Sequence, residues 1–234
     1  MNRKIDGIFS LYSQIILFDL ETTGLSLDND QIIELAAIKY TNNKKSEIDI
    51  LIKCPLNCPI PKSIVELTGI TNKMLTEKGV IEEDGIEKFL NFLDLNDKAL
   101  LISHNIQFDF SFLLNAIERY GKKIPVSYDI LDTLTIFRDR KPYPNKLEDA
   151  IEYYNLENVK NSHRAIDDVK ALDKFIQKLE DEQNDLKDYI NLIGVHKIHG
   201  VWGHKIPRVT YCIQMMGEKK TRLPDFVKEG KRIY

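Results

Sequence analysis

Short apolar runs separated by polar turns dominate the first half of the chain. The runs Ile15–Leu20, Gln31–Tyr40 and Ser46–Ile52 have the length of strands, and their close spacing predicts an antiparallel meander. Two later runs predict a buried strand at Ala99–Ser103 and another short strand at Tyr128–Leu131.

Apolar positions spaced three and four residues apart predict helices between and after these strands. The predicted helices lie at about Lys62–Leu67, Ile86–Leu95, Phe108–Tyr120, Lys146–Tyr154 and Arg164–Glu182. Three antiparallel strands followed by alternating strands and helices predict an α/β fold, with a mixed five-stranded sheet and helices on both faces. The periodicity fades from about Leu186, so we expect a domain of residues 1–186 and a C-terminal extension of residues 187–234.

Composition suits one α/β domain with a full-sized core, or one domain plus an appendage, because 43% of the 234 residues are apolar. The net charge of −3 conceals an uneven distribution. Residues 187–234 carry 10 Lys and Arg against 4 Asp and Glu, about +6, which leaves about −9 on the rest. Such a basic segment favours a polyanionic partner, and a merely solvated tail is the alternative. No apolar stretch has the length of a membrane span and cysteines are few, so we expect a cytoplasmic protein.

Asp19 and Glu21 interrupt the first apolar run. Because side chains alternate along a strand, both carboxylates share a face with Ile15 and Leu17. Two neighbouring negative charges on a buried strand repel each other and lose hydration unless a strong positive charge lies between them. A divalent cation with oxygen ligands is the simplest such charge, so the pair predicts a metal site.

Two helices each add one inward-facing acid. Asp168 shares the apolar stripe of its helix with Leu172, and Asp109 shares the stripe of an earlier helix with Leu113. An acid in a first turn gains about 0.3–1 kcal/mol from the helix dipole, which is too little to account for burial. Together with the pair on the first strand, these acids strengthen the metal hypothesis.

His163 lies five residues before Asp168, too far round a helix to share its face. It is better placed in the loop that leads into the last helix. A histidine at the rim of an acidic metal cluster suits a general base, because imidazole ordinarily titrates near neutrality. A surface histidine without a role is the alternative, and only the four acids argue against it.

Three segments carry a family resemblance. They are DLETTGL at 19–25, HNIQFDFSFL at 104–113 and HRAIDDV at 163–169. In order and spacing they resemble the motifs of the DEDDh exonucleases, which include the proofreading epsilon subunit of bacterial DNA polymerase III, its PolC-type counterparts and RNase T. The resemblance covers roughly residues 13–180 and implies an RNase H-like fold, whose first three strands are antiparallel. It implies nothing about the extension.

Residue by residue, the resemblance implies a catalytic set: the metal ligands Asp19, Glu21, Asp109 and Asp168, and the general base His163. The remaining implied residues contact the substrate. These are Thr22, Thr23 and Gly24 in a turn that holds the 3′-terminal nucleotide through backbone groups, Leu25 as a wedge against the terminal bases, and His104, Asn105 and Phe108 along the same pocket. The implied cofactors are two Mg²⁺ or Mn²⁺ ions.

The implied reaction is 3′→5′ hydrolysis of single-stranded DNA ends to nucleoside 5′-monophosphates, in proofreading or repair, with a DNA polymerase as a candidate partner. RNA 3′ ends, as for RNase T, are the alternative substrate, because nothing in the motifs separates ribose from deoxyribose. A non-catalytic module that binds nucleic acid or a polymerase is a third interpretation, against which the intact set of five residues argues.

Three features outside the motifs each have more than one interpretation. Glu34 interrupts the second apolar run, where a local ion pair is favoured over a supporting role at the site. The extension contains candidate zinc ligands without a standard spacing: His196, His199, His204 and Cys212. Trp202 and Tyr211, among Lys and Arg, either stack on single-stranded nucleic acid or dock an edge onto the domain.

Overall fold

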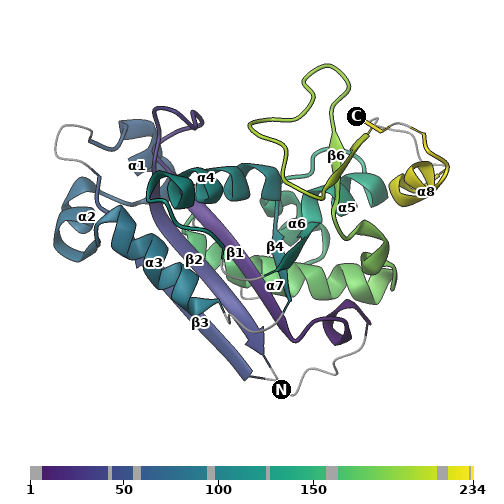
Figure 1. Cartoon of the computed structure of the whole chain (residues 1–234), viewed down its shortest axis with the longest axis horizontal. Coiled ribbons are helices and arrows are strands. Elements are labelled where there is room, and N and C mark those ends of the chain that lie inside the picture. Colours follow the sequence, from purple (N-terminus) through teal and green to yellow (C-terminus); the bar gives the residue numbers. More distant parts are fainter. Residues whose placement is uncertain are drawn as a thin grey trace.

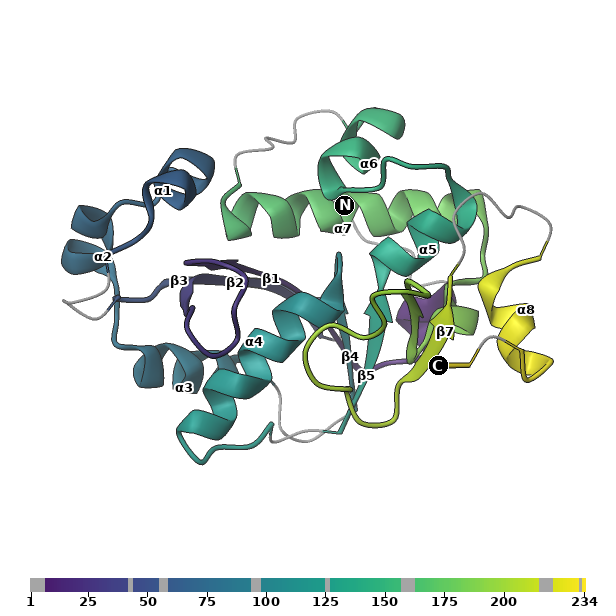
Figure 2. The same cartoon turned by 90° about the horizontal axis from the view of Figure 1, so that it is seen from above.

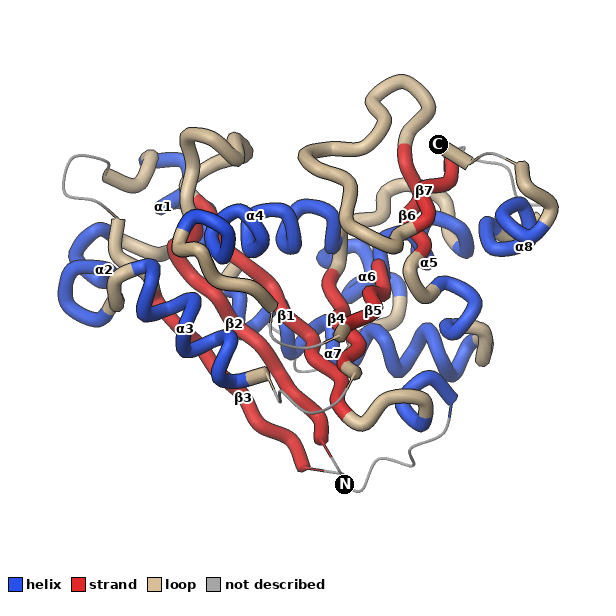
Figure 3. Tube along the Cα trace, in the orientation of Figure 1, coloured by secondary structure: helices blue, strands red, loops and turns tan. Residues whose placement is uncertain are grey.

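The computed structural model describes residues 7–41, 44–54, 59–93, 98–124, 127–156, 163–214, 221–231 and 233–234. Its centre is a five-stranded sheet of order β3-β2-β1-β4-β5 (Figure 1, Figure 3). The strands are β1 Gln14–Thr22, β2 Ile32–Thr41, β3 Lys44–Leu51, β4 Ala99–Ser103 and β5 Tyr128–Asp132. The pairs β1–β2 and β2–β3 are antiparallel, whereas β1–β4 and β4–β5 are parallel. The predicted mixed sheet and its antiparallel start are confirmed.

Helices cover both faces of this sheet, with α4 on one side and α7 on the other (Figure 2). They are α1 Lys62–Thr68, α2 Asn72–Lys78, α3 Glu82–Phe92, α4 Ile106–Arg119, α5 Thr133–Arg140, α6 Leu147–Tyr153, α7 Ala165–Glu182 and α8 Leu223–Lys228, with short 3₁₀ helices at Gly7–Ser10 and Leu186–Tyr189. All five predicted helices are present. The sequence pattern does not predict α2, α5 and α8, which are short and depend on their packing.

The alternation along β1 divides the core into two layers. Ile16 and Phe18 belong to the layer beneath α3 and α4, and Ile15 and Leu17 to the layer beneath α7. All four are fully or almost fully buried, as a central strand covered on both faces requires. Asp19 continues the α7 face, as the alternation predicts.

The described part of the extension packs on both layers. Strands β6 Leu192–Val195 and β7 Thr210–Ile213 form a separate parallel pair, and α8 follows β7. Tyr211 is buried in the α4 layer, whereas Cys212 and Leu223 are buried in the α7 layer. The backbone joins them to the sheet, because the amide of Asn191 donates to the carbonyl of Ile130 in β5 at 2.9 Å. In the described part of the chain, no helix has the length and apolarity that crossing a membrane requires.

Candidate metal centre

The site lies where β1 and β4 separate. Their pairing ends at Leu17 and Ile102, so Asp19 stands two residues beyond the last paired position. A β-bulge between Glu21 and Thr22 then turns the chain away from β2. Ligands of open α/β sheets commonly bind at the carboxyl ends of strands, where neighbouring connections diverge.

Asp19, Glu21 and Asp168 bring carboxylate oxygens within 4.8 Å of one another. Within the described residues, this is the one group of three or more His, Cys, Asp or Glu side chains with such spacing. Oδ1 of Asp168 is buried without a hydrogen-bond partner. Carboxylate oxygens are the ligands that Mg²⁺ and Mn²⁺ prefer, and a cation here would both contact the orphaned oxygen and balance the charge. The residues therefore fit a divalent metal.

Asp109 approaches from the other face of the sheet. It is buried in the first turn of α4, and its Oδ2 accepts a hydrogen bond from Oγ of Ser103 at 2.7 Å. It is outside the three-carboxylate group, yet after burial it is the largest cause of the raised pKa of Asp19. Asp109 thus lies beside Asp19 and apart from the other two acids.

Burial and repulsion by neighbouring carboxylates raise the pKa values of all four acids, and for Glu21 the charge of Arg164 opposes the rise only in part. Burial and then repulsion by Asp109 raise the pKa of Asp19 well above its ordinary range. Burial followed by the charge of Asp168 raises the pKa of Glu21 to about 9. Burial raises the pKa values of Asp109 and Asp168 to about 7 each. A divalent cation would displace these protons, so metal binding is coupled to pH.

Glu34 faces the same space but has a cationic partner. It is fully buried on β2, directly opposite Glu21. Nε and Nη2 of Arg164 both donate to its Oε1, the former at 2.9 Å, and the amide of Ala165 donates to its Oε2 at 2.7 Å. Glu34 is in an ion pair as predicted, but the expectation of a local partner is wrong, because Arg164 lies 130 residues away in the chain. Because Arg164 is the N-cap of α7, this contact holds the start of that helix.

His163 precedes Arg164 and lies in the loop before α7, partly exposed. Its φ of 46° is in the left-handed region, which costs a non-glycine residue of order 1 kcal/mol. Such strain persists only where the surroundings hold the backbone, and the Glu34–Arg164 contact is adjacent. The candidate helix caps Asn161 and Ser162 lie outside the described residues.

Asp30 shapes the turn that follows Glu21. Its Oδ1 accepts a hydrogen bond from Oγ1 of Thr23 at 2.8 Å, and Oγ1 of Thr22 donates to the carbonyl of Gly24 at 2.6 Å. A Cβ at Gly24 would lie 2.5 Å from Oδ2 of Asp30, so the turn requires glycine. Leu25 projects from it with 74% of its surface exposed.

His104 makes contacts within the protein through both ring nitrogens. Nε2 lies 2.9 Å from the carbonyl of Asn145, and Nδ1 lies 3.0 Å from Oγ1 of Thr133. Burial lowers its pKa, so the ring is neutral and donates through Nε2. Asn105, exposed and left-handed at φ 73°, is the N-cap of α4. Phe108 lies one residue before Asp109, with its ring 5.1 Å from that of Trp202.

Asp132 organises this edge of the site through a helix-capping role that was not predicted from the sequence. The buried carboxylate accepts from the amides of Asn105 at 2.9 Å and Ile106 at 3.2 Å, and so holds the start of α4. It also caps α5 through the amides of Leu134 and Thr135. An Asp at the end of a strand and before Thr-Leu-Thr is a helix-capping signal that could have found it.

The candidate zinc ligands of the extension do not assemble. The rings of His196 and His199 lie 4.7 Å apart, but Cys212 is buried, and no metal-holding group of three forms there among the described residues. Tyr211 is also buried, and its hydroxyl donates to Oε1 of Gln107 at 2.8 Å. For Tyr211, docking onto the domain is therefore the correct alternative.

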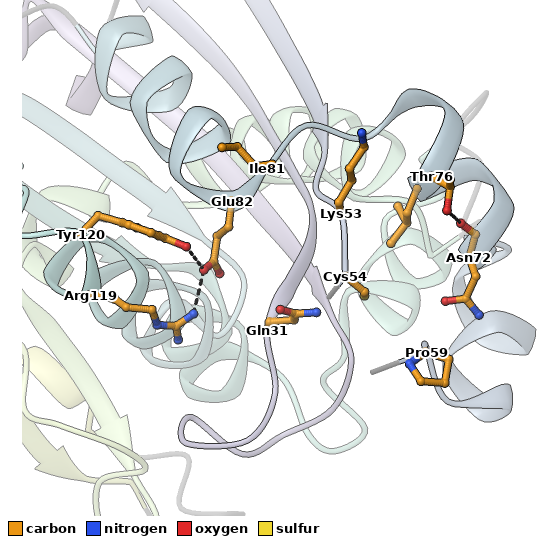
Figure 4. Close-up of a pocket in the computed structure, with 11 residues that line it drawn as sticks. Gln31, Lys53, Cys54, Pro59, Asn72, Thr76, Ile81, Glu82, Arg119 and Tyr120 are labelled. Carbon is orange, nitrogen blue, oxygen red and sulfur yellow. Dashed lines mark hydrogen bonds and ion pairs between the residues drawn. The ribbon is translucent and has the colours of Figure 1, made fainter. Parts of the chain in front are cut away.

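A cavity of about 740 Å³ lies between α2, α3 and the end of α4 (Figure 4). Arg119 and Tyr120 both donate to Oε2 of Glu82 there, at 2.7 and 2.9 Å. None of the four acids lines it. The candidate site is therefore located by its cluster of carboxylates and not by this cavity.

Residues 16–176 match the model of an exonuclease family, RNase_T. The chain belongs to this exonuclease family. It is 37% identical over 197 residues to the DNA polymerase III PolC-type of Caldanaerobacter subterraneus subsp. tengcongensis, which covers 82% of this chain and 13% of that protein. It is 33% identical over 178 residues to Exonuclease DPD1, chloroplastic/mitochondrial, of Arabidopsis thaliana, covering 70% of this chain and 55% of that protein. The chain thus spans a small part of the polymerase and about half of the plant exonuclease.

Solved structures agree on the fold of this exonuclease-family chain. E. coli Exonuclease I in complex with a dA16 oligonucleotide superposes with a TM-score of 0.65 at 20% identity, covering 76% of this chain and 42% of that one. At this identity the likeness shows the fold alone. The RNase H-like fold and the resemblance to DEDDh exonucleases are confirmed.

Proposed function

We propose that the chain is a metal-dependent 3′→5′ exonuclease that shortens single-stranded DNA and releases nucleoside 5′-monophosphates. The observation that carries the proposal is the cluster of Asp19, Glu21 and Asp168, with Asp109 beside it, in a member of the exonuclease family. The PolC-type relatives are named as DNA polymerases, which favours DNA as the substrate and proofreading or repair as the role.

In this proposal Asp19, Glu21 and Asp168 would hold one divalent ion, and Asp109, with Asp19, would help to hold a second. When bound, Mg²⁺ or Mn²⁺ supplies Lewis-acid activation of a water and charge neutralisation at the scissile phosphate. His163 accepts the proton of the attacking water, from a loop whose backbone is held next to Arg164. Without metal, the raised pKa values of the carboxylates oppose their deprotonation at neutral pH. A bound cation would favour the deprotonated form of all four.

The substrate end is placed by the turn after β1. The Asp30 contacts fix the backbone of Thr22, Thr23 and Gly24, which holds the 3′-terminal nucleotide. Leu25 is exposed beside them and packs against the terminal bases. Asn105 and Phe108 complete the pocket, whereas His104 acts by holding the loop of Asn145 rather than through a free ring nitrogen.

A denaturing-gel time course tests the proposal. Single-stranded DNA and RNA of one sequence, each labelled at the 5′ end, are incubated with Mg²⁺, with Mn²⁺ and with EDTA. We expect a ladder that shortens from the 3′ end only with metal, faster for DNA. His163→Ala should slow it by about 10²–10⁴-fold, the usual contribution of a general base.

Two results would contradict parts of this proposal. Faster shortening of RNA than of DNA would show that RNA 3′ ends are the preferred substrate. Intact oligonucleotides under every condition, with retained binding of single strands, would leave a non-catalytic binding module.

A further inference from the structure

The extension places its tryptophan against the helix that carries Asp109. The ring of Trp202 lies 5.1 Å from that of Phe108 and 6.1 Å from that of Phe112, nearly parallel to the latter at 22°. Phe108 immediately precedes Asp109 in the first turn of α4. The indole is nevertheless 38% exposed, so part of its surface is open to solvent.

The loop that carries Trp202, residues 196–209 between β6 and β7, is held firmly beside α4 (Figure 1, Figure 2). Nε2 of the buried Gln107 donates to the carbonyls of Trp202 at 2.6 Å and His204 at 2.9 Å. The hydroxyl of Tyr211 donates to Oε1 of the same Gln107 and accepts from the amide of Ile206, each at 2.8 Å. A loop ordered before a ligand arrives loses little conformational entropy on binding.

The same loop touches the segment that presents Leu25. A Cβ at Gly203, where φ is +66°, would lie 3.0 Å from Cδ1 of Leu27 and 3.2 Å from Oγ of Ser111. The backbone at Gly203 is thus pressed against α4 and against the turn after β1. Trp202 therefore adjoins both elements that the proposed substrate end contacts.

The charge of the loop has one sign. Residues 196–209 contain three Lys and Arg and three His, and no Asp or Glu. Lys197 is exposed, and in the described part of the chain it has no ion pair. Ile198 beside it is 82% exposed. In this loop Lys205 lies over the rings of Tyr211 and Tyr234, and Arg208 over that of Tyr128. A basic segment that also carries an exposed aromatic ring is the chemistry by which proteins bind single-stranded nucleic acid, and each stacked base contributes about 1–3 kcal/mol.

We infer that the 196–209 loop is a stacking platform for single-stranded DNA, with Trp202 as the ring on which a base lies and Lys197 near the phosphates. The inference rests on the proposed exonuclease function, because the strand on the platform is the one whose 3′ end enters the acidic site. Simple docking of the loop accounts for the contact with Phe108. It does not account for the exposed indole or for the absence of acidic residues.

Fluorescence tests contact directly, because Trp202 is the single tryptophan of the chain. The Asp19→Asn variant, which should not degrade the strand, is titrated in Mg²⁺ with single-stranded DNA of about 12 nucleotides, within the range that one binding domain covers. We expect saturable quenching of the indole and protection of it from acrylamide. Binding detected by the anisotropy of a labelled strand, without any change at Trp202, would overturn the inference.

Kinetics separate the platform from the catalytic site. The 4-nitrophenyl ester of thymidine 5′-monophosphate is small enough to use the acidic site alone. Trp202→Ala should raise the KM for the oligonucleotide by about 5–150-fold, which corresponds to one lost stacking contact. Hydrolysis of the ester should fall much less than that of the oligonucleotide, and Trp202→Phe should restore most of the KM.

The control is Leu11→Ala, since Leu11 is another exposed apolar residue, at 58%, and it precedes the start of β1. An unchanged KM in Trp202→Ala, or equal losses on ester and oligonucleotide, would overturn the platform. Failure of the unaltered protein to hydrolyse the ester would instead count against the proposed function, and the fluorescence titration would still decide the platform.

Discussion

Two buried charge clusters in this molecule are built on opposite plans. Near α8, Asp185 accepts hydrogen bonds from both Arg140 and Arg222, so its negative charge meets two cations of the chain. At the end of β1, the charges that, after burial, raise the pKa of Asp19 are the carboxylates of Asp109, Asp168, Glu21 and Glu34. Among the described residues, Oδ1 of Asp168 has no hydrogen-bond partner. A balanced cluster is explained by folding, whereas a one-sided cluster requires a counter-charge from outside. This contrast supports the proposal that the second cluster binds a divalent metal.

The contrast is tested most strongly by removing one charge from the acidic cluster. We expect Asp19→Asn to lower the rate of strand shortening by about 10³-fold or more, because metal activation is worth several kcal/mol. In EDTA the melting temperature should stay the same or rise, since one repelling charge is gone. Asp181→Asn, at the exposed end of α7, is the control. A marked loss of stability in EDTA would show that Asp19 is structural.

The opposite result is expected at the balanced cluster. Asp185→Ala removes a buried carboxylate shared by Arg140 and Arg222. Among the described residues it leaves Arg140 only the longer ion pair with Glu182 at 3.4 Å, and it should lower the free energy of unfolding by about 2–4 kcal/mol. Ester hydrolysis per folded molecule should be unchanged. Asp225→Ala removes an exposed partner of the same Arg222 and should cost about 0–1 kcal/mol in chemical denaturation. Equal losses in the two variants would remove the distinction between buried and surface pairs.

Glu34 combines features of both clusters. It lies opposite Glu21 in the acidic cluster, but like Asp185 it is paired with an arginine, Arg164. In Glu34→Gln the guanidinium of Arg164 loses its charge partner, and the start of α7 next to His163 is held less firmly. We expect kcat to fall by about 10–100-fold, the usual cost of losing a residue that orients an active group. KM for the oligonucleotide should change little.

Glu66→Gln provides the control for Glu34, because the Lys62–Glu66 pair is exposed on α1. Restoration of kcat by Glu34→Asp, even in part, would support a positioning role. If kcat falls only as far as the loss of folded protein explains, and Glu34→Asp does not restore it, Glu34 is a packing residue and not a positioning residue.

Local periodicity predicted the sheet and the inward acids. Alternation along β1 places Asp19 and Glu21 on one face, and the helical stripe turns Asp109 and Asp168 inward, so each needs only a few neighbouring residues to be recognised. The three motifs then supplied the family. These signals are short-range in the chain, which is why they survive without a structure.

The remainder depends on partners far apart in the chain. Nothing near Glu34 indicates Arg164, 130 residues away, and nothing near Gln107 indicates the loop of Trp202, 95 residues away. His104 likewise has contacts that its neighbours in the sequence do not indicate. The motif implied a pocket residue, but two distant partners, Thr133 and Asn145, use both ring nitrogens. Such roles depend on tertiary contacts, which cannot be predicted from the residues nearby in the sequence.

The last test needs no mutation, because the pH dependence of stability also distinguishes the two clusters. The pKa values of Glu21, about 9, and of Asp168, about 7, are raised in the fold, whereas unfolded carboxyls titrate near 4. The folded protein therefore binds more protons than the unfolded chain between these values. Its stability in EDTA should fall as pH rises from about 4 to about 9.

Bound metal should oppose this fall, because it binds the deprotonated carboxylates. With Mg²⁺ at ten times its dissociation constant, stabilisation is about 1.4 kcal/mol, or roughly 3–6 °C in melting temperature for a chain of this size. Melting curves with Mg²⁺ and with EDTA should thus diverge as pH rises. In Asp19→Asn they should stay together, while Asp225→Ala should behave like the unaltered protein. Parallel curves at every pH would mean that the acids are already balanced within the chain, and the contrast between the two clusters would fail.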